Sequence, residues 1–301
     1  MTDQHPLVTI GLPVYNGVNF IEECIDSILT QTLTDFELII SDNGSNDATQ
    51  SICEAYAKRE PRIRYFRIED NQGAAWNYNK VFALARGKYF KWAAHDDVIK
   101  PLNIERCTEV LEKDPSVVLC YAKSALIDER GVFLKNLDDN LERLQDRVSE
   151  RLRGFNPGAC HPIFGVIRHS ALKRTDLIGS YPASDLTLLW QLLLIGKFAE
   201  VPEVLFLRRT HPQTSVRANP DYRSRMKWFA PKRTSWWYLP TWHHVWKYSQ
   251  SIGKANIGFM DKVRCYRVLS ARYFLHPGWM IKDIPLAFGA RPSWMRKSDI
   301  Y

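Results

Sequence analysis

The sequence has few of the features that mark disulfide-rich, zinc-binding or membrane-spanning proteins. Its six cysteines are scattered without a C-x-x-C pair, so neither a disulfide framework nor a zinc site is expected. No apolar run approaches the roughly 18 to 20 residues that cross a bilayer, and the polar N-terminus lacks the charged and apolar regions of a signal peptide. We therefore expect a cytoplasmic protein, and 301 residues with 45% hydrophobic content can bury a substantial core.

Glutamate is absent from the last third of the chain, which makes that third strongly basic. Residues 205–301 contain 18 Lys and Arg against four Asp, a net charge of +14, whereas residues 1–204 contain 23 against 29. Seven of the ten Trp also lie in the last third. We therefore expect a catalytic region over 1–215 and a basic, Trp-rich, mainly helical C-terminal segment over 216–301.

The C-terminal segment admits three interpretations. It packs as a structural extension of the first region, it forms a homo-oligomer, or it lies as a peripheral segment on an anionic membrane surface at the inner face of the cell membrane. The one-sided charge and the interleaved aromatic residues favour the membrane.

The first hundred residues alternate between strand and helix patterns. The continuous apolar run at 7–14 is typical of a strand buried on both faces, further strands are expected at 36–40, 62–68 and 88–94, and helical stretches separate them. This alternation predicts an α/β fold with a doubly wound, mainly parallel, Rossmann-like sheet, whose ligands bind beyond the carboxyl ends of the strands.

Every one of these four strands ends in small, polar or acidic residues. The four groups, in chain order, are Pro13, Tyr15 and Asn16; the run 42–47 with Asp42 and Ser45; Asn71 and Gly73; and His95, Asp96 and Asp97. Each group alone also fits a solvated turn or a helix cap. Four in succession favour one composite site, in which two adjacent carboxylates would hold a divalent cation and, through it, a diphosphate.

The region from 101 to 215 supplies further candidates. We expect strands at 116–122, 161–167, 197–201 and 204–209, a hairpin turn at 128–131, a helix within 135–157, a short helix capped by Ser170 and an apolar helix over 186–195. Asp185 precedes the apolar helix, either as a charge favoured by the helix dipole or as a general base on a rigid element. Arg208, Arg209 and His211 at a strand end suit a diphosphate and its metal ion.

At this point the chain resembles the family 2 glycosyltransferases of the GT-A fold over about residues 7–215. The motifs that carry the resemblance lie in the family's order: Pro13-Val14-Tyr15-Asn16; Ser27 with Gln31; Asp42-Asn43-Gly44-Ser45-Asn46-Asp47; Asn71, Gly73 and Asn79; Ala85 to Tyr89; Ser184-Asp185; and His211. The family moves a sugar from a nucleotide diphosphate sugar to an acceptor, usually with inversion. The resemblance implies a nucleotide-binding half over about 1–100 and an acceptor half over about 101–215.

The resemblance also implies roles for individual residues. Asp185 would be the catalytic base; Asp97 and His211, with Asp96 as a further ligand, would hold Mn²⁺ or Mg²⁺. Nucleotide and donor binding would fall to a larger set, namely Pro13, Tyr15, Asn16, Asp42, Ser45, Asn71, Gly73, Asn79, Asp96 and Arg209. His95, His161, Trp92 and Ser184 are candidates for the donor or acceptor pocket, although aromatic residues in apolar runs, Trp190 included, are more often core.

Four positions depart from the family pattern. Ala94 replaces the first carboxylate of the metal motif, Asn43 replaces an Asp, Ser184 replaces a Glu, and Tyr78 stands where an Arg is common.

The resemblance implies a saccharide or lipid-linked acceptor and a role in polysaccharide or glycoconjugate synthesis. The competing functions are a non-enzymatic protein that binds nucleic acid or membrane through basic and aromatic residues, and a nucleotidyltransferase. We do not expect nucleic acid as a partner, because carboxylates at the strand ends repel phosphate unless a metal intervenes.

Overall fold

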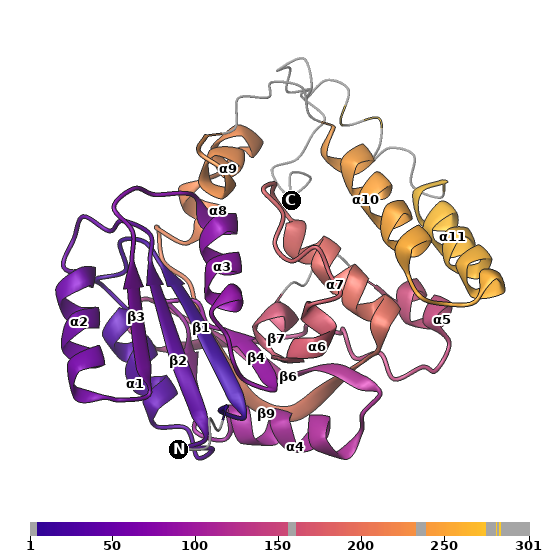
Figure 1. The fold of residues 1–301 in the computed structure, drawn as a ribbon. Helices are drawn as coiled ribbons and strands as arrows, with labels where there is room; N and C mark the ends of the chain where they lie inside the picture. Colours follow the sequence, from indigo (N-terminus) through magenta and orange to yellow (C-terminus); the bar gives the residue numbers. More distant parts are fainter. Residues whose placement is uncertain (1–4, 156–160, 233–238, 275–280, 282, 284–301) are drawn as a thin grey trace.

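The structure is a computed structural model that describes residues 5–155, 161–232, 239–274, 281 and 283. Its centre is one mixed sheet with the strand order β3-β2-β1-β4-β8-β6-β9-β5, and β7 pairs with β6 (Figure 1). The N-terminal strands β1 (Val8–Val14), β2 (Phe36–Asp42), β3 (Ile63–Arg67) and β4 (Tyr89–Trp92) run parallel. The expected doubly wound α/β sheet is confirmed.

The second half of the sheet mixes both strand directions. The long strand β6 (Val117–Ile127) is parallel to β9 (Lys197–Arg209), and antiparallel to β7 (Phe133–Leu137) and β8 (Val166–Arg168). The short β5 (Val98–Ile99) is antiparallel to the end of β9. This last pairing places residues 96–99 beside residues 206–211, which lie far away in sequence.

Helices cover both faces of the sheet and create two apolar cores. One core contains α1 (Ile21–Leu29), α2 (Thr49–Arg59) and α4 (Asn103–Lys113). The other contains α3 (Ala74–Ala83), α6 (His169–Leu172) and α7 (Ser184–Ile195), together with α5 (Val148–Arg153). Helix α7 is apolar on all sides because it lies in the middle of this second layer.

The described helices of the C-terminal segment pack on the second core. Helices α10 (Pro240–Lys254) and α11 (Phe259–Phe274) lie against α7 and α5 (Figure 1). Tyr248 stacks on Trp190 with ring centroids 4.6 Å apart, and Ile252 and Leu269 are buried in the same cluster. The interpretation of this segment as a structural extension of the first region therefore holds for α10 and α11. Helices α8 (Ser215–Ala218) and α9 (Tyr222–Phe229) lie over the start of α3.

Three local predictions were wrong, and a fourth was right only in part. Within 135–157 only Val148–Arg153 is helical, because the preceding chain pairs with the sheet through a bridge between Arg143 and Phe198. The expected strands 197–201 and 204–209 form one strand, in which Pro202 and Glu203 make a bulge opposite β6.

The other two errors concern the chain around β8. A 3₁₀ turn at His161–Phe164 precedes the short strand Val166–Arg168, where one strand over 161–167 was expected. Helix α6 begins at His169, and its N-cap residue Arg168 makes no capping bond, so Ser170 is not the cap. The five cysteines in the described residues are free and buried.

Candidate active site

The loops that follow β1 and β2 hold each other in place at the carboxyl edge of the sheet. Asn16 has a φ of 53°; its N–H donates to Ser45 Oγ at 2.9 Å, and its side-chain oxygen accepts from Asn46 N at 2.9 Å. Pro13 is buried at the end of β1, whereas the Tyr15 ring is 41% exposed. The structure thus places Asn16, Ser45 and Asn46 together and leaves the Tyr15 ring accessible.

Asp42 is fully buried and its carboxylate organises its own loop. It accepts hydrogen bonds from Ser45 N, the Tyr65 hydroxyl and Arg67 Nη1, each at 2.8 Å. Burial and then the bond to Asp42 raise the pKa of Tyr65 well above its ordinary value. A carboxylate has about four acceptor positions, so Asp42 retains at most one for a nucleobase.

The loop between β3 and α3 is fixed by an amide network that the sequence alone did not indicate. Asn43 donates to Asn71 Oδ1 at 2.9 Å and to Gly73 O at 3.2 Å, and accepts from Gln72 N at 2.9 Å. An Asp could not donate these two bonds, which gives the departure at Asn43 a structural reason.

Gly73 and Asn79 contact segments that lie far from them in the sequence. Gly73 has a φ of 91°, and an added Cβ would lie 2.5 Å from Phe229 O, so the segment after α9 packs directly on it. Asn79 exchanges two hydrogen bonds with the backbone of Ile178 and thereby ties α3 to the loop before α7. These contacts hold Gly73 and helix α3 in place.

The acidic turn after β4 meets the end of β9. Asp97 Oδ1 accepts from Arg209 N at 2.9 Å, and Asp96 Oδ2 lies 3.0 Å from His211 Nε2. Asp97 and His211 are 8% and 5% exposed, and His95 packs beside Gly17. The structure therefore pairs Asp96 with His211, whereas Asp97 is bonded to the backbone of Arg209.

The two carboxylates of this turn have opposite pKa shifts. Burial and then the negative charge of Asp96 raise the pKa of Asp97 well above its ordinary value. Burial also acts on Asp96, but the His211 hydrogen bond and the nearby His95 charge hold its pKa below the ordinary value. A divalent cation would relieve the repulsion between two adjacent buried carboxylates.

Arg209 requires a correction. Its guanidinium is buried and donates to Asp96 O, Asp128 O and Glu129 O and, at 2.6 Å, to Glu23 Oε2. Four protein acceptors leave little capacity for a donor phosphate, so we reassign Arg209 from donor binding to positioning of the acidic turn. Phe20 completes this support, with Arg209 4.9 Å above its ring and the His211 ring 4.6 Å from it.

The predicted base lies in the first turn of α7. Ala183, with a φ of 59°, turns the chain into the helix; Ser184 is buried and Asp185 is partly exposed. The Ser184 hydroxyl has no hydrogen-bond partner among the described residues.

Tyr78 links α7 to the acidic turn. Burial, followed by the charges of Asp96, Asp97 and Asp185, raises the pKa of the Tyr78 hydroxyl. Tyr78 therefore lies within electrostatic reach of all three carboxylates, and its hydroxyl makes no hydrogen bond within the described part of the chain.

The remaining pocket candidates divide into two kinds. Trp92 and Trp190 are fully buried core residues, and the Trp92 indole donates to Tyr78 O at 3.0 Å, so the assignment of Trp92 to a pocket is corrected. His161 is partly buried and its Nδ1 lies 2.6 Å from Asp139 Oδ1; the other Asp139 oxygen accepts from Ser124 Oγ at 2.5 Å. Asp139 fixes the His161 ring, which sequence spacing did not reveal.

A sheet with acidic and polar loops at its carboxyl edge defines an α/β protein that binds ligands at that edge. Comparison with known proteins narrows this class. The family model "Glycosyl transferase family 2" matches residues 9–175, more than half of the chain. The chain belongs to glycosyl transferase family 2.

Curated relatives match part of the chain. An uncharacterized glycosyltransferase of Rickettsia felis is 39% identical over 161 residues, covering 51% of this chain and 26% of that protein. Chondroitin synthase of Escherichia coli is 35% identical over 131 residues, covering 44% of this chain and 19% of that protein. The chain matches only 23% to 26% of the length of three glycosyltransferases from Rickettsia species.

Solved structures support the fold. The TarS fragment 1–349 of S. aureus, in complex with UDP-GlcNAc, has a TM-score of 0.65 at 17% identity, covering 89% of this chain and 73% of that one. The mannosyltransferase PcManGT from Pyrobaculum calidifontis, in complex with GDP-Man and Mn²⁺, has a TM-score of 0.54 at 16% identity, covering 93% and 85%. These likenesses confirm the GT-A type fold, and family membership argues against a nucleic-acid-binding protein or a nucleotidyltransferase.

Proposed function

We propose that this chain is an inverting glycosyltransferase that moves a sugar from a nucleotide diphosphate sugar to an acceptor hydroxyl. The observation that carries the proposal is that the acidic turn with Asp96 and Asp97 lies at the carboxyl edge of the sheet, bonded to His211 and Arg209 N and, through His95, beside Gly17 in the loop after β1. Sugar transfer needs positive charge at the diphosphate, which a metal ion held by the acidic turn would supply, and a base near the acceptor, which Asp185 on α7 would supply.

The nucleotide half of the donor would bind along the loops after β1, β2 and β3. The exposed Tyr15 ring is available to a nucleobase, and Asp42 keeps one acceptor position for a base N–H. Asn16, Ser45, Asn71 and Gly73 shape these loops through the bonds described above. Interactions at this distance from the reacting carbon position the donor and supply binding energy.

The acidic turn has the chemistry of a site for Mn²⁺ or Mg²⁺. Two carboxylates and an imidazole are suitable ligands, and Mg²⁺ is often held by one or two carboxylates together with substrate phosphates. Among the described residues no group of three or more His, Cys, Asp and Glu already has the geometry of a complete metal site. Asp97 and His211, with Asp96, would hold the ion, which supplies positive charge for the diphosphate leaving group.

Asp185 would remove the proton from the attacking acceptor hydroxyl. It lies in the first turn of α7, a buried helix that fixes its position, and the helix dipole favours its ionised form. Attack from the face opposite the leaving diphosphate gives inversion. Ser184, whose buried hydroxyl has no hydrogen-bond partner in the described residues, is suited to contact the sugar.

The acceptor would approach past His161, which Asp139 orients. We propose a saccharide or lipid-linked acceptor in polysaccharide or glycoconjugate synthesis, in line with the chondroitin synthase among the relatives. We retain the division into a 1–100 nucleotide half, a 101–215 acceptor half and a 216–301 segment as part of this proposal.

Peripheral membrane contact is also part of the proposal. Within the described residues no helix is both long and apolar enough to cross a bilayer. Helix α10 exposes Trp242 and Trp246, and α11 begins with the exposed Phe259 and Met260, so these faces remain available to an anionic bilayer or to a second copy of the chain. The proposed place of action is the cytoplasm, at the inner face of the membrane.

A thermal-shift panel of UDP-, GDP- and dTDP-sugars, with and without Mn²⁺, tests the proposal. One nucleotide sugar should stabilise the chain, by more with Mn²⁺ than without it. Asp97→Asn should remove the part that depends on Mn²⁺, because it removes the proposed ligand. Asp35→Asn is the matched control, since Asp35 is exposed at the amino edge of the sheet.

Two results would contradict the proposal. If no nucleotide sugar stabilises a sample that unfolds cooperatively, the chain does not bind a sugar donor. If Mn²⁺ stabilises Asp97→Asn and the parent equally, the metal does not bind at the acidic turn.

A further inference from the structure

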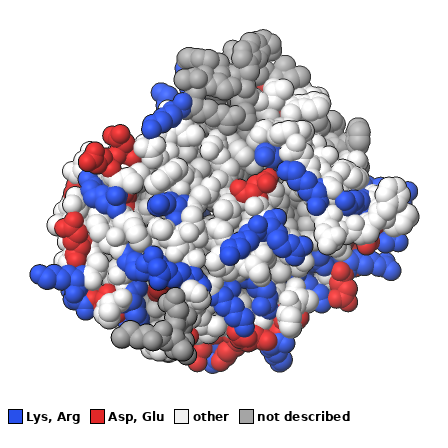
Figure 2. Space-filling view, in the orientation of Figure 1, with Lys and Arg blue, Asp and Glu red and all other residues white. Residues whose placement is uncertain are grey.

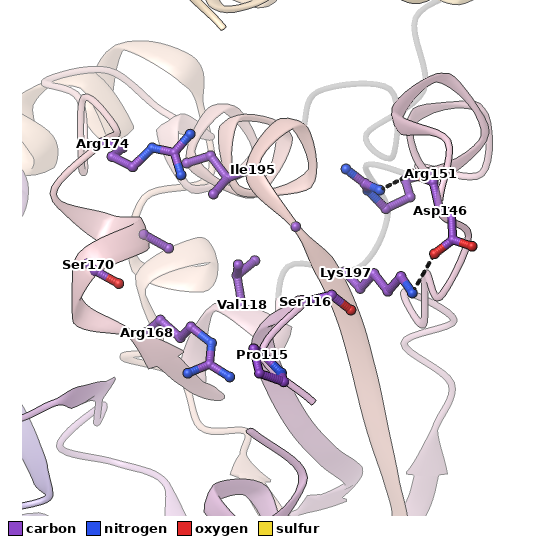
Figure 3. Close-up of a pocket in the computed structure, with 12 residues that line it drawn as sticks. Pro115, Ser116, Val118, Asp146, Arg151, Arg168, Ser170, Arg174, Ile195 and Lys197 are labelled. Atoms are coloured by element: carbon purple, nitrogen blue, oxygen red, sulfur yellow. Dashed lines mark hydrogen bonds and ion pairs between the residues drawn. The ribbon is translucent and has the colours of Figure 1, made fainter. Parts of the chain in front are cut away.

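A cavity of about 430 Å³ lies at the opposite edge of the sheet from the acidic turn (Figure 3). It is formed by the amino ends of β6 and β9 and the last turn of α7, with Ser116, Lys197 and Ile195 in its wall. Helix α7 begins at Ser184, beside the candidate active site, and its 12 residues span about 18 Å before they reach this cavity. The cavity is therefore separate from the donor site.

The wall of this cavity is basic. Four cationic side chains line it, Arg151, Arg168, Arg174 and Lys197, against the single carboxylate of Asp146. Asp146 pairs with Lys197 at 2.7 Å and points into solvent, with 92% of its side chain exposed. Figure 2 shows Lys and Arg side chains spread over one face of the molecule, with Asp and Glu side chains among them.

Arg151 is a buried charge that has no carboxylate partner among the described residues. It is 5% exposed, and it donates from Nε to Leu193 O at 2.9 Å and from Nη1 to Gln145 O at 3.0 Å and Asp146 O at 2.9 Å. These acceptors are neutral carbonyls, and Nη2 has no partner in the described part of the chain. A buried guanidinium is normally paired with an anion. No carboxylate among the described residues pairs with Arg151, so its positive charge in the cavity wall could be neutralised by a bound anion.

Arg168 repeats this arrangement on the other side. Its guanidinium donates to Val117 O at 2.7 Å, to Asp114 O at 3.0 Å, to Leu111 O and to the Tyr89 hydroxyl at 3.3 Å, so four neutral acceptors leave one N–H for a ligand. The nearest carboxylates have other partners: Asp114 accepts from Ser116, and Glu112 pairs with Lys88. The carbonyl bonds hold the Arg168 guanidinium in place without neutralising it.

Two polar groups at the rim have no interaction among the described residues. They are the guanidinium of Arg174 and the hydroxyl of Ser170, both exposed. In Figure 3, Arg168 and Arg174 extend from the side of the cavity formed by β8 and α6, and Arg151 extends from the opposite side. Three guanidiniums thus surround one space.

We propose that this cavity binds a phosphate or sulfate group, as a free anion or as an ester, at a site distinct from the donor site. Guanidinium groups match the oxygens of phosphate and sulfate in pairs, and such charge-assisted bonds are stronger than neutral ones. A volume of about 430 Å³ accommodates a small molecule or one charged sugar unit of a longer glycan. The proposal depends on the cavity alone and stands independently of the proposed transferase activity.

Isothermal titration of the full chain tests this site with two probes, inorganic tripolyphosphate and glucose 6-phosphate, at fixed ionic strength. Saturable binding of either probe, unchanged when the donor nucleotide is present at saturation, supports the site. Tighter binding of tripolyphosphate identifies a free anion as the ligand, and tighter binding of glucose 6-phosphate identifies a sugar ester. Uncharged glucose should not bind.

Arg174→Gln should weaken the tighter probe about tenfold, because it removes one charge-assisted contact. Lys173→Gln is the matched control: Lys173 is the exposed neighbour that does not line the cavity, and its loss should change affinity less than twofold. Neither variant touches a buried group, so both should fold. Absence of saturable binding, equal loss in both variants, or displacement of the probe by nucleotide would each overturn the proposal.

Discussion

Asn43 offers a sharp test of how the loops at the carboxyl edge are held. In Asn43→Asp the side chain can still accept from Gln72 N, but its two donated bonds, to Asn71 Oδ1 and Gly73 O, become contacts between oxygen atoms. Asn71 cannot simply turn its amide to compensate, because its Oδ1 also accepts from Gly73 N at 2.8 Å. The substitution restores the residue of the family pattern, yet it should destabilise this chain.

The expected loss follows from these bonds. Two hydrogen bonds at about 1 kcal/mol each, and a carboxylate placed at a position that is 2% exposed, give a loss of about 2 to 4 kcal/mol in the free energy of unfolding. Since the network holds residues 71–73, the affinity for a nucleotide sugar should fall as well.

Urea unfolding followed by circular dichroism measures the loss. Asn46→Asp is the matched control, because Asn46 is an exposed residue of the same loop and only its backbone N–H is bonded, to Asn16. It introduces the same charge and should change stability by about 0.5 kcal/mol or less. If Asn43→Asp is as stable as Asn46→Asp, the amide network does not hold the loop.

Three further predictions concern single residues. Burial and the adjacent His243 lower the pKa of His244 from 6.5 to about 4, so acidification from pH 6.5 to pH 4 should remove about 3 kcal/mol of unfolding free energy through this group. Buried Asp283, whose pKa is raised to about 6 mainly by burial, has the opposite effect on stability as the pH falls. Comparison of the free energies of unfolding of the parent and His244→Gln at pH 7 and pH 4.5 isolates the contribution of His244. A difference between the two proteins that is the same at both pH values would contradict the assignment. Tyr78→Phe should keep the thermal midpoint but lower kcat/KM about tenfold if the hydroxyl contacts the donor; unchanged kinetics would exclude that contact. Gly44 has a φ of 79° and an added Cβ would lie 2.5 Å from Glu69 O, so Gly44→Ala should lose about 2 kcal/mol in urea unfolding, and a neutral result would refute the strain.

The parts of the fold set by local pattern were predictable from the sequence. The strands before Asn16, Asn43 and His95 are continuous apolar runs, and the rule that ligands bind at the carboxyl ends of parallel strands gathered their ends into one site. The pairing of β5 with the end of β9 then joins Asp97 to Arg209, a contact between distant segments that periodicity does not specify.

The errors have a common cause, which is that distant contacts decide local structure. Leu141 and Leu144 have helical spacing with Val148, but Leu141 N donates to the Tyr121 hydroxyl and the chain beyond it bridges to β9, so the helix begins only at Val148. Pro202 suggested a break between two strands, whereas a bulge accommodates it within one.

The roles of charged residues were the least predictable from the sequence. Arg208 and Arg209 are neighbours of the same type, yet the Arg209 guanidinium is buried against four acceptors that come from three other segments. The basic cavity likewise draws Arg151, Arg168 and Arg174 from α5, β8 and the end of α6. Sequence identifies such side chains as charged, but only packing shows whether each charge is already satisfied.

The central claim is that Asp185 acts as the base in a site shared with the acidic turn. Its most direct test is sugar transfer by Asp185→Asn, with the donor identified by the thermal-shift panel and Asp35→Asn as control. We expect transfer to fall at least about a thousandfold, while the affinity for the nucleotide sugar stays within about threefold of the parent. Transfer by Asp185→Asn at the rate of the parent would contradict the account.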